Sequence, residues 1–338
     1  MRQIVMTRSG GVDVLDIQEK PDPVPGKGEV LIRVKAAGLN FADILARQGL
    51  YPDAPKPPCV VGYEVAGIVE SAGEEADQTL TGRPVLALTR FGGQSDVVTV
   101  PVEQVSAKPE GLSFEEAAAI PVNYLTAYAL LVVMGSLKKE DSILIHNAGG
   151  GVGLAALDVA KQIGATTYGT ASPSKHDFLK KRGIDHTIDY RSQDWLPVLK
   201  RLTDGRGVEL VIDSLGGSHW KKSYRALRAT GRLGMFGISA ASGDGLTGKW
   251  RMLKALLQTP RFHPFSLLNR NRGVFGLNLG HLWNEIDKSR QWMRVILDGV
   301  EEGWVRPYVD KAFPFDRVAE AHSYIESRKN IGKVVLTP

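Results

Sequence analysis

A glycine-rich turn near the middle of the chain constrains the fold more than any other feature. It reads Ala148-Gly149-Gly150-Gly151-Val152-Gly153. The turn lies between the strand-like run 142–146 and the helical run 152–163, and its A-x-G-x-x-G spacing is typical of dinucleotide-binding loops. A side chain at Gly150 would block a pyrophosphate, and one at Gly153 would push the helix away from the strand. The turn therefore predicts a phosphate site, against the alternative of a glycine-rich turn without a ligand.

Strand-like and helical runs alternate after this turn. Strands are predicted at 166–170, 209–213, 232–236 and 273–279, with helical segments between them. This alternation predicts an α/β fold with a parallel, doubly wound sheet.

The two ends of the chain follow other patterns. Residues 1 to about 122 hold short β-branched runs between prolines and glycines, with helices expected only at 41–48 and near 114–119. The tail from about 283 to 338 holds two predicted helices and the strand 333–336, without a βαβ unit. We therefore expect the tail to return and complete the first domain.

Composition bounds the class of protein. The 338 residues are 43% hydrophobic, which supplies the cores of two domains. Cys59 is the single cysteine, so no internal disulfide or cysteine-rich zinc site can form. No apolar signal segment is visible, the apolar run 126–134 is too short to span a membrane, and the net charge of +5 does not indicate nucleic acid. We expect a cytoplasmic protein with no nucleic-acid partner.

The end of the strand after the glycine-rich turn indicates the cofactor. An NAD site places Asp or Glu there, but this chain has no carboxylate before Asp177. It has Ser172, Ser174 and Lys175 instead, and hydroxyls with a cation suit a 2′-phosphate. The pattern favours NADPH, with Tyr190 placed to cover the same phosphate. The alternative is that Lys175 is an ordinary solvated residue.

The spacing of the histidine, cysteine and serine residues does not indicate a metal site or a hydrolase. The seven histidines are scattered, without an H-x-x-x-H pair or a cysteine partner. No Ser-His-Asp grouping or G-x-S-x-G elbow is recognisable either. We therefore expect no bound metal and no hydrolase.

Several motifs resemble the medium-chain dehydrogenase/reductase family, in particular its zinc-independent quinone oxidoreductases and, among these, the vesicle amine transport protein branch. The motifs are the glycine-rich turn and the runs at 38–43, 46–51, 62–67, 213–217 and 330–334. Asn40 and Tyr63 stand where the zinc enzymes of the family carry a cysteine and a histidine ligand, and the structural-zinc lobe is missing. The resemblance implies a GroES-like catalytic domain, residues 1–122 completed by 283–338, around a Rossmann NADP-binding domain, residues 123–282.

The family's active site lies in the cleft between these domains. Asn40 and Tyr51 are implied as catalytic residues beside the nicotinamide and the substrate, whereas Leu45 replaces a second tyrosine that some quinone reductases carry. Together the motif and the resemblance give these cofactor-binding residues: Thr126, Ala148, Gly149, Gly150, Gly151, Val152, Gly153, Ser172, Ser174, Lys175, Tyr190, Ser214, Phe236, Gly237, Asn330 and Lys333.

Hydride transfer to a quinone or an α,β-unsaturated carbonyl needs a hydrogen bond to the carbonyl oxygen, where negative charge develops. Tyr51 or Asn40 would donate it, and water would supply the proton. The alternatives are that Tyr51 is a packed loop aromatic and that Asn40 caps the helix that follows it.

Residues 245–272 form an unusual segment with six basic and no acidic residues, interleaved with Trp, Phe and Leu. We expect a helical lid that packs its apolar face on the protein, against the alternative of a peripheral membrane contact. The predicted function is therefore an NADPH-dependent reductase of quinones or enones. The alternative is a low-turnover NADP-binding protein that binds lipid or a membrane through this segment.

Because the apolar strand 273–279 lacks Pro and charge, we expect it to pair with its own copy in a homodimer, unless the segment 245–272 covers that edge.

Overall fold

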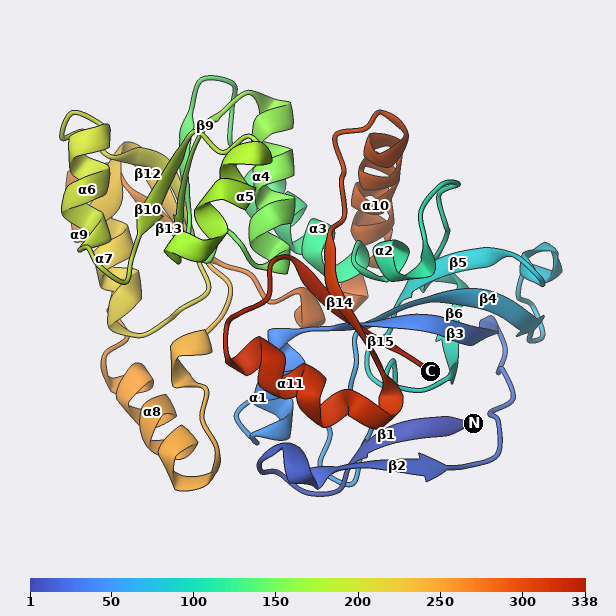
Figure 1. Ribbon diagram of the computed structural model, residues 1–338. Coiled ribbons are helices and arrows are strands. Elements are labelled where there is room, and N and C mark those ends of the chain that lie inside the picture. Colours follow the sequence, from blue (N-terminus) through green and yellow to red (C-terminus); the bar gives the residue numbers. More distant parts are fainter.

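Six parallel strands form the sheet that contains the glycine-rich turn (Figure 1). The computed structural model describes all 338 residues. In spatial order the strands are β10 (His186–Asp189), β9 (Thr166–Ala171), β8 (Ser142–Ile145), β11 (Val208–Asp213), β12 (Leu227–Met235) and β13 (Gly273–Gly276). The chain runs outward from β8 to β10 and returns to β11, so the strand order reverses between β8 and β11. In such sheets the carboxyl ends of the strands at the reversal point form a ligand crevice.

Helices cover both faces of this sheet, as right-handed crossovers require. The connecting helices are α4 (Gly151–Ile163), α5 (His176–Lys181), α6 (Trp195–Leu202) and α7 (Ser218–Ala226). Leu144, Ile145, Val211 and Ile212 of the central strands are fully buried. Continuous apolar strands of this kind are expected where both faces of a parallel sheet are covered.

The second sheet combines strands from both ends of the chain. Its order is β14 (Val309–Pro314), β15 (Lys333–Thr337), β3 (Glu29–Leu39), β4 (Glu64–Ala72), β5 (Pro84–Leu88) and β7 (Val105–Ala107), while β6 (Val97–Pro101) pairs with β3. Beside it lies the hairpin of β1 (Arg2–Met6) and β2 (Leu15–Glu19). Val334 of β15 pairs with Leu39 of β3, so the C-terminal tail joins the N-terminal strands. The strand β14 was not expected from the sequence.

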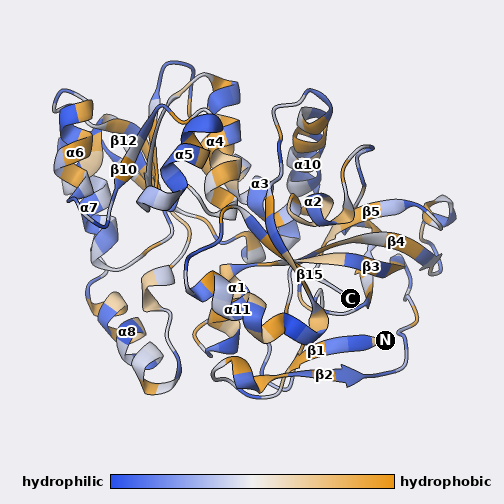
Figure 2. Ribbon diagram, in the orientation of Figure 1, coloured by the Kyte–Doolittle hydropathy of each residue, from blue (hydrophilic) through white to orange (hydrophobic).

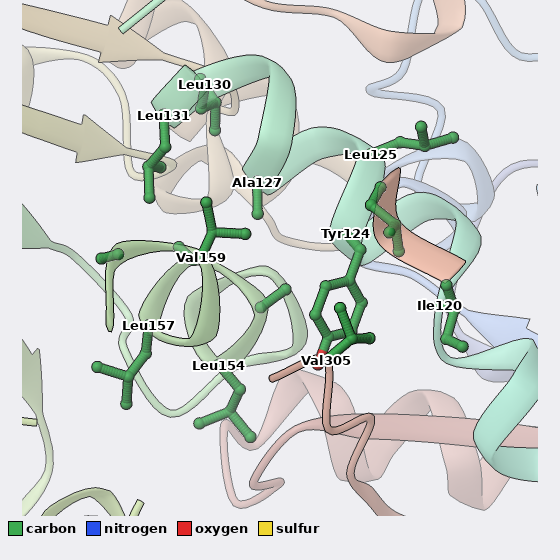
Figure 3. Packing of buried hydrophobic residues seen from close by; sticks show 14 of the residues in the cluster. Ile120, Tyr124, Leu125, Ala127, Leu130, Leu131, Leu154, Leu157, Val159 and Val305 are labelled. Atoms are coloured by element: carbon green, nitrogen blue, oxygen red, sulfur yellow. The ribbon is translucent and has the colours of Figure 1, made fainter. Parts of the chain in front are cut away.

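Helices from three parts of the chain pack around these sheets. They are α1 (Phe41–Arg47), α2 (Phe114–Ala118), α3 (Pro121–Tyr128), α10 (Ile286–Glu301) and α11 (Val318–Glu326). Figure 3 shows the apolar contact of α3 with α4, in which Tyr124 lies beside Val305 and near Leu154.

Beneath this contact, Asp158 of α4 is fully buried and forms three polar contacts, which we call the Asp158 cluster. It accepts a hydrogen bond from the Tyr124 hydroxyl at 2.7 Å, and it pairs with Arg182 at 2.6 Å and Arg306 at 3.0 Å. The guanidinium groups of Arg182, which follows α5, and of Arg306, which precedes β14, thus contact one carboxylate.

The segment 245–272 does not form the expected lid. It contains α8 (Gly245–Leu257) and α9 (Pro264–Arg270), and none of its residues lines the large cleft described below. Leu246, Trp250 and Leu257 are 85%, 68% and 79% exposed, so the apolar face is not packed on the protein. In Figures 1 and 2, α8 extends away from both sheets and carries hydrophobic and hydrophilic residues. No helix of the chain is both long and apolar enough to cross a membrane.

Candidate active site

A cavity of about 1270 Å³ opens between the two sheets. Fourteen of the predicted site residues line it: Asn40, Tyr51, Thr126, Gly150, Gly151, Val152, Gly153, Lys175, Tyr190, Ser214, Phe236, Gly237, Asn330 and Lys333. Four do not line it: Ala148, Gly149, Ser172 and Ser174. Ala148 is fully buried, and the hydroxyls of Ser172 and Ser174 lie 3.2 Å apart at the end of β9.

The glycine-rich turn has the close approaches that its spacing predicts. Helix α4 begins at Gly151, directly after the turn. A Cβ atom on Gly153 would lie 2.4 Å from the carbonyl oxygen of Asn147, which confirms that only glycine fits where helix meets strand. A Cβ on Gly150 would lie 2.8 Å from the Asn147 side chain. The turn therefore leaves the N–H groups of the first helical turn free beside the cavity.

Lys175 is buried rather than solvated, so the alternative interpretation of this residue is wrong. It is only 6% exposed, and its ammonium group donates a hydrogen bond to the carbonyl oxygen of Asn330. Its aliphatic stem lies over the glycine-rich turn, because a Cβ on Gly149 would be 2.7 Å from Lys175 Cδ. Burial lowers the pKa of Lys175, with the nearby cations of Arg191 and Arg328 acting in the same direction. The side chain of Lys175 is therefore held beside the glycine-rich turn.

Asn40 is held by a buried ion pair. Its side-chain Oδ1 accepts a hydrogen bond from Lys333 Nζ at 2.7 Å, and its Nδ2 donates to Glu64 Oε1 at 2.9 Å. Glu64 and Lys333 also pair directly, and both are almost completely buried. Asn40 is also the N-cap residue of α1 and forms a capping box with Asp43, so the interpretation of Asn40 as a helix cap holds as well. Its second amide hydrogen has only a 3.5 Å contact, with the carbonyl oxygen of Gly38.

Tyr51 lies at the other side of the same cavity. Its hydroxyl has a long contact of 3.5 Å to Asn278 Oδ1, and the amide of Asn278 donates to Asp53 at 2.9 Å. His281 lies 2.9 Å from the same carboxylate. Burial raises the pKa of Tyr51, and the carboxylate of Asp53 adds to this effect, so the phenol keeps its proton. Sequence reasoning missed Asn278 and His281, because contacts between loops more than two hundred residues apart leave no local pattern.

Asp43 is a buried carboxyl next to the Asn40 site. Its Oδ2 accepts a hydrogen bond from the Asn40 backbone N–H at 2.8 Å, whereas its Oδ1 has no partner. Burial raises the pKa of Asp43 to about 7, although the Asn40 N–H and the Lys333 charge oppose the shift. This carboxyl therefore gains or loses its proton near neutral pH in the folded protein.

The Asp43→Asn variant is expected to lose part of the pH dependence of stability. Because the folded state keeps a proton that the unfolded chain releases near pH 4, wild-type stability falls as the pH rises to about 7. The difference between pH 5 and pH 8 is expected to be roughly 2–3 kcal/mol from this carboxyl alone. Urea unfolding at both pH values measures it, with the exposed Asp177→Asn as the control. Parallel pH curves for wild type and Asp43→Asn would contradict the assignment.

Three potential metal ligands do come together, although their sequence spacing gave no sign of it. The ligand atoms of His146, Asp213 and His219 lie within 4.8 Å of one another. They are joined by hydrogen bonds instead: His219 Nδ1 is 2.6 Å from Asp213 Oδ2, and Ser223 Oγ donates to the same oxygen at 2.6 Å. Ser223 is fully buried, so this grouping offers no accessible nucleophile. His146 and His219 both line the cavity.

Comparison with known protein families gives two matches that together extend over most of the chain. Residues 26–124 match the alcohol dehydrogenase GroES-like domain, and residues 182–336 match a family described as zinc-binding dehydrogenase. The synaptic vesicle membrane protein VAT-1 homolog of Danio rerio is 41% identical over 342 positions, which cover 99% of this chain and 70% of the relative.

Solved structures agree with these matches. The crystal structure of the human VAT-1 homolog-like protein superposes with a TM-score of 0.87 at 32% identity, covering 100% of this chain and 98% of the other. The Escherichia coli quinone oxidoreductase complexed with NADPH superposes with a TM-score of 0.88 at 29% identity, covering 100% of both chains. This chain therefore belongs to the medium-chain dehydrogenase/reductase family, among its quinone oxidoreductase-like enzymes and with clear similarity to the VAT-1 homologues.

Proposed function

We propose that this enzyme transfers a hydride from NADPH to a quinone or an α,β-unsaturated carbonyl without the help of zinc. The observation that carries the proposal is that the phosphate loop and the Asn40–Tyr51 pair open on one cavity. The similar Escherichia coli enzyme, which was crystallised with NADPH, supports the choice of cofactor. We assign the catalytic domain to residues 1–122 with 283–338, and the cofactor domain to residues 123–282.

The residues of the cavity fit NADPH in their size and chemistry. The glycines of the turn leave room for a pyrophosphate beside the start of α4. Lys175 would bind the 2′-phosphate, with Tyr190 beside it and with the Ser172 and Ser174 hydroxyls at the same strand end. Phe236 and Gly237, after β12, would adjoin the nicotinamide, which supplies the hydride when bound.

Two donors are available for the substrate carbonyl. The Tyr51 hydroxyl and the second amide hydrogen of Asn40 each have only a 3.5 Å contact in the protein. Either can therefore give a stronger hydrogen bond to an oxygen on which negative charge develops. Lys333 and Glu64 fix which way the Asn40 amide faces. Asn40 and Tyr63 stand where the zinc enzymes of the family carry their cysteine and histidine ligands, and the Asn40 amide is bonded to Lys333 and Glu64. Both observations support a reaction without zinc. Elemental analysis of the purified protein tests this.

Turnover is tested by NADPH oxidation with a panel of quinones and enones. The Tyr51→Phe variant is expected to lower kcat about ten- to a hundredfold, because it removes one hydrogen bond to the developing charge. The dissociation constant of NADPH is expected to stay within about twofold of wild type. Tyr128→Phe, outside the cavity, is the matched control. Wild-type protein that binds NADPH but reduces no member of the panel would refute the reductase.

The exposed segment 245–272 favours a second candidate, a peripheral contact with an anionic membrane. Apolar side chains of α8 are exposed beside Lys249, Arg251 and Lys254, and no acidic residue lies in the segment. Flotation with vesicles containing phosphatidylserine is expected to recover the protein at low salt. A Trp250→Glu and Leu257→Glu double variant should lose recovery by about tenfold or more while keeping NADPH binding. Equal recovery of the two proteins would exclude this surface.

We also propose a homodimer formed through β13. This strand is the last of its sheet and pairs only with β12, so one row of backbone groups is unpaired within the protomer. Pairing with a second copy about a twofold axis would satisfy these groups. Sedimentation that shows a monomer at micromolar concentration would refute the dimer.

A further inference from the structure

A chain of hydrogen bonds, which we call the His146–His219 chain, borders the cavity through Thr170, His146 and His219. Its contacts run from Thr170 Oγ1 to His146 Nδ1 at 3.0 Å, from His146 Nε2 to Ser223 Oγ at 3.1 Å, and from Ser223 to Asp213 at 2.6 Å. It ends where His219 Nδ1 meets the same carboxylate at 2.6 Å. All five residues come from strand ends or from α7.

The donor and the acceptor of each hydrogen bond in this chain can be assigned. Burial alone would raise the pKa of Asp213, but the hydrogen bond from His219 and the neighbouring His146 lower it to about 2, so this carboxylate only accepts. Ser223 gives its proton to Asp213 and must therefore accept from His146 Nε2. Burial lowers the pKa of His146 to about 3, so it is neutral and its Nδ1 accepts from Thr170.

His219 is thereby held in one tautomer. Its Nδ1 carries the proton that Asp213 accepts, so Nε2 is the ring nitrogen that can accept a hydrogen bond. No protein group bonds to Nε2, and His219 lines the cavity. The ring is also fixed in orientation, since its centre lies 4.5 Å from that of His146 and 5.4 Å from that of Trp195. The protein thus holds His219 Nε2 in a fixed position at the cavity, and no protein group donates a hydrogen bond to it.

The other residues that line the cavity indicate the ligand of His219. Lys175 and Tyr190 line the cavity on the side of the proposed 2′-phosphate, and the purine is attached to the same ribose. The same cavity is also lined by Trp195, Leu215, His219 and Trp220. Trp220 Nε1 is a buried donor without a partner, and the ammonium of Lys222 is occupied by Asp194 at 2.6 Å. This wall thus offers an unused acceptor and an unused donor among flat apolar surfaces, which suits a purine with an exocyclic amine.

We propose that His219 recognises adenine by accepting a hydrogen bond from its exocyclic amine, and that Asp213 is the positioning residue that holds the ring in the tautomer with the proton on Nδ1. The proposal rests on the proposed use of NADPH. It adds a base-specific contact to a cofactor site otherwise defined by phosphates.

The test compares the dissociation constants of NADPH and of its deamino analogue, in which hypoxanthine replaces adenine and a carbonyl replaces the amine. Wild-type protein is expected to prefer NADPH by about tenfold or more, because the analogue sets two acceptors against each other. Binding is followed by nucleotide fluorescence, so no turnover is needed. In His219→Leu the preference should fall to within about twofold. His263→Leu, an exposed histidine outside the cavity, is the matched control and should keep the wild-type preference.

Each result decides between specific alternatives. Equal binding of the two nucleotides by wild type would overturn the role of His219 while leaving the proposed cofactor intact. A preference that persists in His219→Leu would also overturn it, and a purely structural role would weaken both nucleotides equally. Failure of wild type to bind either nucleotide would instead refute the proposed cofactor. Because the wild-type comparison alone can refute the proposal, it does not depend on the folding of any variant.

Discussion

Replacing Lys175 by methionine is expected to weaken NADPH binding about ten- to a hundredfold, because a charged hydrogen bond to the 2′-phosphate is lost. Methionine keeps most of the aliphatic stem that lies over Gly149, so the glycine-rich turn should remain supported. NADH binding is expected to change by no more than about twofold, since NADH lacks the phosphate that Lys175 would contact. Titrations of both nucleotides by fluorescence measure the two effects.

A control variant and a pH dependence test this prediction further. Lys180→Met, exposed on α5, is the matched control and should leave both affinities unchanged. Because burial lowers the pKa of Lys175, the preference for NADPH should decline at a less alkaline pH than an exposed lysine would give. An equal loss of NADPH and NADH affinity in Lys175→Met would show that Lys175 only supports the loop.

The Asp158→Ala variant is expected to lose about 3–5 kcal/mol of unfolding free energy, the largest stability effect predicted for a single side chain here. The carboxylate is fully buried, and its removal leaves the nearly buried guanidinium of Arg182 without a countercharge. It also leaves the Tyr124 hydroxyl without its acceptor. Urea unfolding followed by far-UV circular dichroism measures the loss.

Asp177→Ala supplies the comparison, because this exposed carboxylate on the neighbouring helix has no ion pair and should cost less than about 0.5 kcal/mol. If Asp158→Ala were no less stable than Asp177→Ala, the Asp158 cluster would not hold α4 to the C-terminal region. NADPH affinity measured on the folded fraction separates this effect from damage to the site.

Local patterns predicted most strands of the parallel sheet, although β12 begins at Leu227 and not at residue 232. Gly153 and Gly150 have steric requirements that a sequence displays directly, and the strand and helix around them appear within one or two residues of the expected bounds. The expected strand 273–279 is shorter, since β13 ends at Gly276. Beyond that residue the chain turns toward the cavity, where Asn278 contacts Tyr51.

Side-chain partnerships across the cavity could not be predicted in the same way. The sequence shows Asn40 before a helix, which equally suits a helix cap, and only the fold brings Lys333 to it from the C-terminus. His146 and His219 are separated by three crossover connections, so their contacts with Ser223 and Asp213 have no sequence signature. The lid expected from residues 245–272 was wrong because amphipathic spacing identifies an apolar face but not what covers it.

The pairing of β15 with β3 has a consequence for biosynthesis. Leu39 finds its partner Val334 only after the other sheet has been made, because all six strands of that sheet lie between residues 142 and 276. During translation the strands of that sheet can therefore pair while residues 37–39 of β3 still lack their partner strand. The segment that pairs with β3 also brings Lys333 to Asn40, so the sheet and the Asn40 site are completed together.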